Sequence, residues 1–296
     1  MEQNLLLLGV DGGGTSCRAR LSEFSGKILG EAVTGPANLR LGLSDSLSAV
    51  AEAVEHCLDR AAMGREVLGR VVACLALAGA SEPGHLAAAQ EQRHPFHKTV
   101  VTTDAHAACI GAHGDKDGGI IIAGTGTVGW AIVRGQAFRI GGWGLPISDE
   151  GSGAWLGNEV LRRVLWARDG RIPWTPLLRV VFVDFAENPH AIVEWIATAT
   201  PRDLGLFARL IVGHAANGDA TASELMKLAA AHIDALAARL LAVGADRLAL
   251  AGGLAPSLRS WLAAATKSHL VKPDGDALEG AVRLARMAAG SMAQVA

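Results

Sequence analysis

An apolar segment that leads directly into a glycine-rich turn occurs twice in this chain, and this repeat constrains the possible folds more than any other feature. The first copy joins residues 5–10 to Asp-Gly-Gly-Gly-Thr at 11–15, and the second joins residues 118–122 to Ala-Gly-Thr-Gly-Thr at 123–127. Another strand-like segment follows each turn, so each copy is typical of a hairpin. Glycines allow a sharp bend and bring backbone N–H groups close to an anionic ligand. The sequence therefore predicts two phosphate-binding hairpins.

Simpler explanations of these turns fit less well. A hairpin turn without a ligand remains an alternative, but it needs one or two glycines rather than three behind an acid. The stretch 124–129 matches G-x-G-x-x-G, but the dinucleotide motif must open a helix, and residues 128–133 are predicted as a strand. The P-loop signature is absent from the sequence. Asp11, at the end of the first strand, is placed to hold a hydrated Mg²⁺ rather than the phosphate itself.

Other segments also repeat in the same order, which indicates two similar halves with the element order βββαβαβα. We expect an α/β protein with an N-terminal domain at 1–116 and a C-terminal domain at 117–296 that face each other across a central cleft. The second domain carries a helical insertion around 153–244. The matching segments are 74–80 with 247–253, the short strands 100–101 with 270–271, and Asp104-Ala105 with Asp276-Ala277.

Local patterns predict further elements of the first half. Residues 27–32 read as a third strand, and residues 71–78 read as a buried strand. Apolar residues at helical spacing predict a helix over 44–63, with Ser44 or Asp45 as its cap.

The composition excludes several functional classes. Lys and Arg number 27 against 29 Asp and Glu, so nothing indicates binding to nucleic acid or to a membrane surface. The apolar runs are too short to span a membrane. The four cysteines are scattered without metal-ligand spacing, so we expect each to be a small core residue in a reducing cytoplasm. Residues 1–4 lack a signal-peptide pattern.

Four residues outside the hairpins have both a functional and a purely structural interpretation. Asp104 follows a predicted strand, where α/β proteins bind ligands, but Asp is also a common helix N-cap. Asn38 lies in a loop and could be a turn residue. Asp149 could cap a helix that starts after it. Trp143 could belong to the core.

The motifs taken together resemble those of the BadF/BadG-type branch of the actin–hexokinase–Hsp70 ATPase superfamily, and within it the N-acetylglucosamine and glucosamine kinases. The resemblance extends over nearly the whole chain and implies two duplicated actin-like (ribonuclease H-like) ATPase domains. The segments that carry it are Asp11–Thr15, Thr103–Ala105, Ala123–Thr127, Gly141–Gly144 and Asp149–Gly153.

The resemblance implies an ATP-dependent, Mg²⁺-assisted transfer of phosphate to the 6-hydroxyl of glucosamine or N-acetylglucosamine, with Asp104 as the catalytic base and a homodimer as the assembly. A base in that position typically contributes about 10²–10⁴ in rate. The positions implied for ATP are Gly12, Gly13, Gly14, Thr15, Thr125, Gly126, Gly252 and Gly253. The positions implied for the sugar are Asn38, Asp104, Gly141, Gly142, Trp143 and Asp149.

Two other functions stay open. An ATPase activator of a 2-hydroxyacyl-CoA dehydratase shares the hairpins but uses cysteines to bridge a homodimer through an iron–sulfur cluster, and no cysteine here lies on a suitable turn. A nucleotide-dependent regulatory module could keep the fold without transferring phosphate. A repressor-linked sugar kinase would carry a cysteine-rich zinc motif, which is missing from the sequence. The sequence does not distinguish glucosamine from N-acetylglucosamine.

Overall fold

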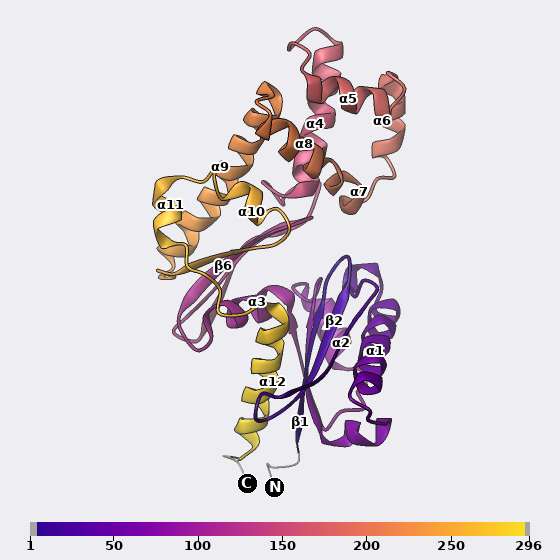
Figure 1. Cartoon of the computed structure of the whole chain (residues 1–296), viewed down its shortest axis with the longest axis vertical. Helices are drawn as coiled ribbons and strands as arrows, with labels where there is room; N and C mark the ends of the chain where they lie inside the picture. The colour runs from indigo at the N-terminus through magenta and orange to yellow at the C-terminus, as the bar shows by residue number, and fades with distance from the viewer. Residues whose placement is uncertain (1–4, 294–296) are drawn as a thin grey trace. The chain divides into compact units, whose positions relative to one another are not determined.

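The computed structural model describes residues 5–293, which form two compact units (Figure 1). Unit 2 is Asp117–Val271, and unit 1 combines the chain before it with the chain from Lys272 onward. The predicted C-terminal domain of 117–296 therefore ends too late. Figure 1 shows the reason, because the yellow C-terminal helix α12 lies beside the indigo strand β1. The expectation about residues 1–4 falls outside the described residues.

Unit 1 is built on a five-stranded sheet with the order β3-β2-β1-β4-β5. β1 pairs antiparallel with β2, whereas β4 lies between β1 and β5 and pairs parallel with both. Every residue of β4 is buried, as expected for a parallel strand that is covered on both faces. The strands are β1 (Leu6–Gly12), β2 (Cys17–Glu23), β3 (Ile28–Thr34), β4 (Val71–Leu77) and β5 (Lys98–Thr103).

Helices cover both faces of this sheet. Leu8 of β1 belongs to one buried cluster with Val50 of α1, whereas its neighbour Leu7 belongs to another with Ala107 of α3 and Ala285 of α12. Successive side chains of a strand point to opposite faces, so α1 covers one face and α3 with α12 cover the other. The helices are α1 (Leu43–Arg60), α2 (Pro83–Gln90), α3 (Asp104–His113) and α12 (Ala277–Ala293), with short 3₁₀ turns at Leu39–Leu41 and Arg65–Arg70.

Helices α3 and α12 approach each other at backbone distance. A Cβ atom at Gly111 would lie 1.9 Å from the carbonyl oxygen of Asp276, and one at Gly280 would lie 1.8 Å from that of Ala107. Only glycine fits at these two positions, so the sequence specifies the crossing that holds the C-terminal helix in unit 1.

Unit 2 is built on a four-stranded sheet with the order β8-β7-β6-β9, in which β6 and β9 are parallel. Helices α4 to α9 form the insertion between β8 and β9. The strands are β6 (Gly118–Ala123), β7 (Thr127–Val133), β8 (Gln136–Gly141) and β9 (Leu248–Ala251). The helices are α4 (Gly153–Arg168), α5 (Pro176–Asp184), α6 (Pro189–Ile196), α7 (Pro201–Gly205), α8 (Phe207–Ala216), α9 (Ala220–Ala242), α10 (Ala255–Leu258) and α11 (Ala264–His269).

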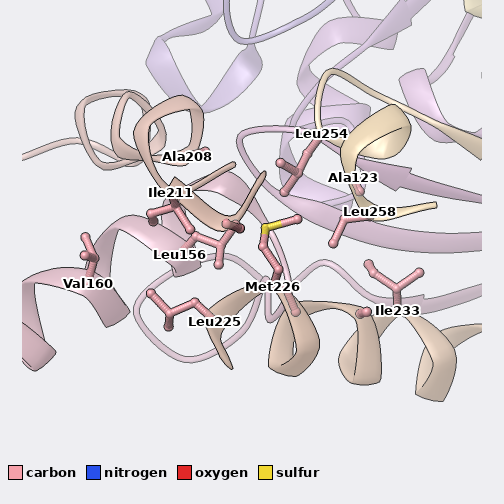
Figure 2. Packing of buried hydrophobic residues seen from close by; sticks show 14 of the residues in the cluster. Ala123, Leu156, Val160, Ala208, Ile211, Leu225, Met226, Ile233, Leu254 and Leu258 are labelled. Carbon is pink, nitrogen blue, oxygen red and sulfur yellow. The ribbon is translucent and has the colours of Figure 1, made fainter. Parts of the chain in front are cut away.

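One continuous buried cluster joins this insertion to the sheet. Figure 2 shows Leu156 of α4, Ile211 of α8 and Met226 of α9 in this cluster, together with Ala123 at the end of β6 and Leu254 beyond β9. The helical insertion therefore packs directly against the hairpin end of the sheet and positions it.

Several local predictions need correction. Helix α1 begins at Leu43, and its N-cap position is Gly42, which has no side chain to cap it; Ser44 and Asp45 lie inside the helix, so neither is the cap. The predicted strand 270–271 is reduced to an isolated bridge between Leu248 and Leu270. All four cysteines are buried, as predicted. Within the described residues, no helix is both long and apolar enough to cross a membrane.

Candidate functional site

The parallel strands of unit 1 end at the same edge of the sheet. In the register of the strands, Gly12 lies opposite Leu77, and Leu77 lies opposite Thr103. Asn38 forms a parallel bridge with Ala78, directly beyond β4. Ligands of α/β sheets bind outside the carboxyl ends of the strands. The first hairpin, Asn38 and the start of α3 at Asp104 are therefore gathered where a ligand is expected.

Packing within the protein explains one glycine of the first hairpin. Gly12 is buried, and a Cβ atom there would lie 2.7 Å from Leu77 Cδ2 and 2.8 Å from the carbonyl oxygen of Ala37. Such distances exclude a side chain, so Gly12 is required by the fold whether or not a ligand binds.

The next two glycines have no such reason. A Cβ atom at Gly14 would lie 3.8 Å from Asn38 Nδ2, and one at Gly13 would lie 3.4 Å from the carbonyl oxygen of Ser16, and neither glycine has a positive φ. These are ordinary contacts, and both Gly14 and Thr15 are exposed. A bare backbone at Gly14 is what the close approach of a phosphate requires.

Asp11 is paired with a guanidinium group. Arg18 donates to Asp11 Oδ2 from Nε at 3.1 Å and from Nη2 at 2.6 Å, and it donates from Nη1 to Asp276 Oδ2 at 2.6 Å. Burial raises the pKa of the Asp11 carboxyl; Arg18 lowers it, nearby Asp276 raises it further, and the net shift is upward. Burial acts in the same direction on Asp276, but the Glu279 N–H and Arg18 hold the pKa of Asp276 below its usual value.

Asn38 caps a 3₁₀ turn and faces the hairpin. Its Oδ1 accepts a hydrogen bond of 3.0 Å from the backbone N–H of Arg40. The structural interpretation of Asn38 as a turn residue is therefore correct for Oδ1. Its Nδ2 is the nearest atom to a Cβ built on Gly14, so the amide stands beside the exposed turn.

Asp104 is the first residue of α3 and is not its cap. The cap is Thr103, whose side chain accepts from the His106 N–H at 3.0 Å. Asp104 Oδ1 accepts from the Ala105 N–H at 2.9 Å, which orients the carboxylate at the helix start. Burial lowers the pKa of the neighbouring His106, which favours its neutral form at pH 7. The capping interpretation of Asp104 is therefore wrong.

In unit 2, the second hairpin is joined to the start of α4. Gly124 N–H donates to the carbonyl oxygen of Gly126 at 2.9 Å, and the N–H groups of Gly153 and Ala154 donate to the carbonyl oxygens of Gly124 and Thr125 at 2.8 and 3.1 Å. A Cβ atom at Gly124 would meet nothing within 4 Å, and its φ is not positive. Gly124 thus resembles Gly14, since neither conformation nor packing requires glycine.

Asp149 lies beside this hairpin in an unusual backbone conformation. Its φ of +66° is in the left-handed region, and its Oδ1 accepts from the Gly144 N–H at 3.1 Å. Asp149 Oδ2 lies only 2.7 Å from the position of a Cβ atom on Gly126, so glycine at 126 makes room for this carboxylate. The side chain of Ser152 caps α4, which contradicts the interpretation of Asp149 as a cap.

The loop after β8 carries Trp143 on the surface. Trp143 is 68% exposed, so the alternative that places it in the core is wrong. The Arg139 guanidinium lies 4.2 Å from the centre of its ring and donates from Nε to the carbonyl oxygen of Gly141 at 3.1 Å and from Nη2 to that of Gly142. Both glycines have positive φ, of 68° and 71°, which explains why glycine occurs there. Arg139 therefore braces a loop that exposes an aromatic ring.

Of the two glycines after β9, the fold requires only the first to be glycine. Gly252 has a φ of +95°, and a Cβ atom there would lie 2.3 Å from the carbonyl oxygen of Ala123. Gly253 would meet nothing within 4 Å. Because β6 and β9 are parallel neighbours, Gly253 lies at the same edge of the unit 2 sheet as the second hairpin.

The residues present fit a magnesium ion supplied together with a nucleotide. Mg²⁺ is often bound by one or two carboxylates, with phosphate oxygens and waters as its other ligands. Asp11 and Asp276 share one guanidinium, and Asp11 Oδ1 accepts no hydrogen bond from any residue in the described range 5–293. That same range contains no group of three or more His, Cys, Asp or Glu that could hold a metal by itself.

The pattern of both hairpins in one chain has a match among known families. The sequence model of the BadF/BadG/BcrA/BcrD ATPase family matches residues 8–285, which include every predicted site residue. The chain belongs to the BadF/BadG/BcrA/BcrD ATPase family. The resemblance noted from the motifs is thereby confirmed.

Relatives of this BadF/BadG-type chain include sugar kinases. Glucosamine kinase GspK of Vibrio cholerae is 41% identical over 278 residues, which cover 94% of this chain and 95% of that protein. A solved structure from Chromobacterium violaceum, described as a candidate N-acetylglucosamine kinase, is 34% identical with a TM-score of 0.88 and covers 96% of this chain and 99% of its own.

A more distant structure shows the common fold alone. The ROK-family glucokinase of Streptomyces griseus, solved with glucose and AMPPNP, has a TM-score of 0.55 at 19% identity and covers 95% of this chain and 98% of its own. With these likenesses, the predicted fold class of two actin-like α/β ATPase domains is confirmed.

The sequence interpretation missed three charged residues of these edges. Arg18 and Asp276 join Asp11, and Arg139 braces the Trp143 loop. A signal for Arg18 was available, because Asp11 and Arg18 flank the glycine turn symmetrically and become direct partners across β1 and β2. Asp276 could be noticed as the counterpart of Asp104 in the repeat, but no local pattern indicates its contact with Arg18, from which most of the chain separates it.

Proposed function

We propose that this chain is an ATP-dependent amino-sugar kinase that phosphorylates the 6-hydroxyl of glucosamine or N-acetylglucosamine. The observation that carries the proposal is the 41% identity to a glucosamine kinase over nearly the whole length of both proteins. The structure is compatible with it, since the candidate residues lie at the carboxyl ends of parallel strands in each unit.

The proposed roles follow from the chemistry of each group. Asp104 accepts the proton of the sugar 6-hydroxyl as that oxygen forms its bond to phosphorus. The Ala105 N–H donates to Oδ1 of Asp104, which orients the proposed proton acceptor at the start of α3. Asn38 is proposed to bind a hydroxyl of the same sugar, because it lies at the same edge of the unit 1 sheet.

Phosphate binding is proposed for the bare backbone of both hairpins. Gly13, Gly14 and Gly124, which neither packing nor a positive φ requires to be glycine, are the positions where a phosphate oxygen is proposed to come close to the backbone. Gly253 is proposed to lie along the nucleoside, with Thr15 and Thr125 as hydroxyl donors. Mg²⁺ at Asp11 would neutralise charge on the transferring phosphoryl group.

For the sugar, the proposed recognition set in unit 2 is the loop Gly141–Trp143 with Asp149. Trp143 offers an exposed apolar ring, and Asp149 offers a carboxylate. Glucosamine is the first substrate to test, because the relative with 41% identity is a glucosamine kinase, and N-acetylglucosamine is the second, because of the Chromobacterium violaceum structure.

The decisive experiment is a coupled assay with ATP, Mg²⁺ and a panel of hexoses and amino-hexoses. We expect turnover with an amino sugar, a 6-phosphate product by mass spectrometry and NMR, and nearly complete loss in Asp104→Asn with sugar binding retained. Absence of turnover with every sugar, and no effect of any sugar on ATP hydrolysis, would favour a regulatory module instead.

The dehydratase-activator alternative is less well supported. All four cysteines are buried, and burial raises the pKa of the Cys17 and Cys74 thiols to about 12, which disfavours the thiolates that an iron–sulfur cluster needs. Iron analysis of the purified protein tests this, and we expect none. A homodimer in the cytoplasm is our proposal for the assembly, to be checked by light scattering and by localisation of the tagged protein.

A further inference from the structure

Arg18 makes the densest set of charged contacts at the edge of unit 1. It stands opposite Asp11 in the β1–β2 register, so both side chains lie on the same face of the sheet. Its Nε and Nη2 both donate to Asp11 Oδ2, and its Nη1 donates to Asp276 Oδ2. One guanidinium thus joins the strand that precedes the glycines to the residue that opens α12.

The two carboxylates need a cation between them. Each lies 2.6 Å from a nitrogen of the same guanidinium, and the Asp11 side chain is only 17% exposed. Two like charges brought together in a partly buried place raise the cost of ionising each other. A divalent cation would neutralise them equally well, because paired carboxylate oxygens are ligands that Mg²⁺ accepts.

We propose that Arg18 is the positioning residue of the magnesium site, which it keeps specific for metal that arrives with nucleotide. By holding Oδ2 of Asp11, it leaves Oδ1 for the metal. By standing between Asp11 and Asp276, it prevents a free divalent cation from binding to the pair. This inference rests on the proposed kinase function and adds a residue to it.

The same strand supplies a matched control. Arg20, two residues along β2, donates to Glu31 Oε1 at 2.5 Å and to Glu279 Oε2 at 2.9 Å. Arg20 thus also joins β2 to a neighbouring strand and to α12. Neither Glu31 nor Glu279 lies at the glycine turn. Arg20 therefore serves as the control for an ion pair with a purely structural role.

The first experiment measures melting temperature against Mg²⁺ concentration without nucleotide. We expect Arg18→Gln to melt below the wild type and to gain about 2 °C when Mg²⁺ reaches ten times its dissociation constant. The wild type and Arg20→Gln should show no such gain. The double variant Arg18→Gln with Asp276→Asn should lose the gain again, because one of the two carboxylates is neutral and Asn still caps a helix.

The second experiment separates positioning from structure in the assay with the wild-type sugar. Loss of a group that orients a metal ligand typically costs about 10–100-fold in activity or metal affinity. We expect that loss in kcat for Arg18→Gln, a smaller one for Arg18→Lys, and almost none for Arg20→Gln. Arg18→Lys should melt without a response to Mg²⁺, since its ammonium still separates the carboxylates.

Equal behaviour of the Arg18 and Arg20 variants, in melting and in kcat, would overturn the proposal. If Arg18→Gln does not fold, Arg18→Lys decides, and a kcat equal to that of Arg20→Lys counts against it. Failure of the kinase proposal is recognised separately, by a wild type that shows no turnover with any sugar. In that case the Mg²⁺ melting curves still test whether Arg18 keeps free Mg²⁺ from the two carboxylates.

Discussion

The first hairpin differs from the second in the residue that precedes the turn, Asp11 in unit 1 and Ala123 in unit 2. Asp11 presents a carboxylate that is held by Arg18. Ala123 presents only its backbone, and its carbonyl oxygen accepts from the Leu254 N–H at 3.0 Å. The last residue of the turn differs in exposure, since Thr15 of unit 1 is exposed whereas Thr127 of unit 2 is only 4% exposed.

This difference teaches that a duplicated strand–turn–strand element has diverged in its chemistry. In unit 1 the edge carries charged side chains, namely Asp11, Arg18 and Asp104. In unit 2 the hairpin edge is made of backbone groups, and the neighbouring loop contributes the carboxylate of Asp149. We infer that the base and the metal ligand come from unit 1 alone, whereas both units supply backbone for the phosphates and side chains for the sugar.

The largest expected effect is that substitution of Asp104 changes mainly kcat, whereas substitution of Asp149 changes mainly KM for the sugar. Asp104→Asn in unit 1 should lower kcat by about 10²–10⁴, because a general base contributes that much. Asp149→Asn in unit 2 should raise KM for the sugar with a smaller loss in kcat, because a binding contact acts on ground state and transition state alike. Steady-state kinetics with the sugar varied at saturating ATP measures both.

If Asp149→Asn lowered kcat as much as Asp104→Asn, the division between units would be wrong. Melting curves of both variants control for folding.

Substitution by alanine should affect stability at a glycine that the fold requires, and ATP binding at a glycine that the fold does not require. Gly252→Ala should lose at least about 2 kcal/mol of stability, because its φ of +95° disfavours a side chain and the new Cβ would strike the Ala123 carbonyl. Gly14→Ala and Gly124→Ala should stay within about 0.5 kcal/mol of the wild type in unfolding free energy. Their KM for ATP should instead rise by about tenfold, a binding loss of about 1.4 kcal/mol.

Chemical denaturation and ATP titration check the glycine prediction. An unchanged KM for ATP in both Gly14→Ala and Gly124→Ala would contradict phosphate binding at these turns.

The brace on the Trp143 loop should affect sugar binding alone. Arg139→Ala removes two hydrogen bonds to glycine carbonyls and a stacking contact of about 0.5–1 kcal/mol with an exposed ring. We expect a several-fold rise in KM for the sugar and no change in KM for ATP. Arg134→Ala, on the turn before β8, is the control, and an equal rise there would count against the brace.

The smallest expected effect is on the pH dependence of stability, through one aspartate at a helix start in each unit. The pKa of Asp276 in unit 1 and that of Asp219 in unit 2 are both held below the usual value, against burial, by backbone N–H groups at a helix start, with Arg18 adding to the effect at Asp276. Since the folded pKa is the lower one, each contributes stability above the unfolded pKa of about 3.9, which is lost as pH falls through the folded pKa.

Asp276→Asn and Asp219→Asn should therefore lower the melting temperature at pH 7, and the gap to the wild type should close below about pH 4. We expect at most about 1 kcal/mol for each, as for other helix caps. A gap that stays constant between pH 7 and pH 3 would contradict a contribution from the ionised carboxylate.

Much of this protein follows from its sequence because the signals are local. The apolar runs before each turn, the alternation in β2 and the repeated glycines indicate both sheets and both hairpins without tertiary knowledge. Asp104 could be recognised as the residue after a strand, but only the structure shows that Thr103 is the cap and that Asp104 is not needed for that role. Similarly, only three-dimensional distances separate Gly12, required by packing, from Gly14.

The sequence by itself determined the α/β class, the duplication and the edge of each sheet where a ligand is expected, because strand periodicity and glycine turns are encoded by neighbouring residues. Tertiary structure alone decided the partners of distant residues. The chain from Lys272 returns to unit 1 because Gly111 and Gly280 allow α3 and α12 to meet at backbone distance. That return brings Asp276 to Arg18, a contact that arises from helix packing and that neither the glycine turn beside Arg18 nor the repeat around Asp276 specifies.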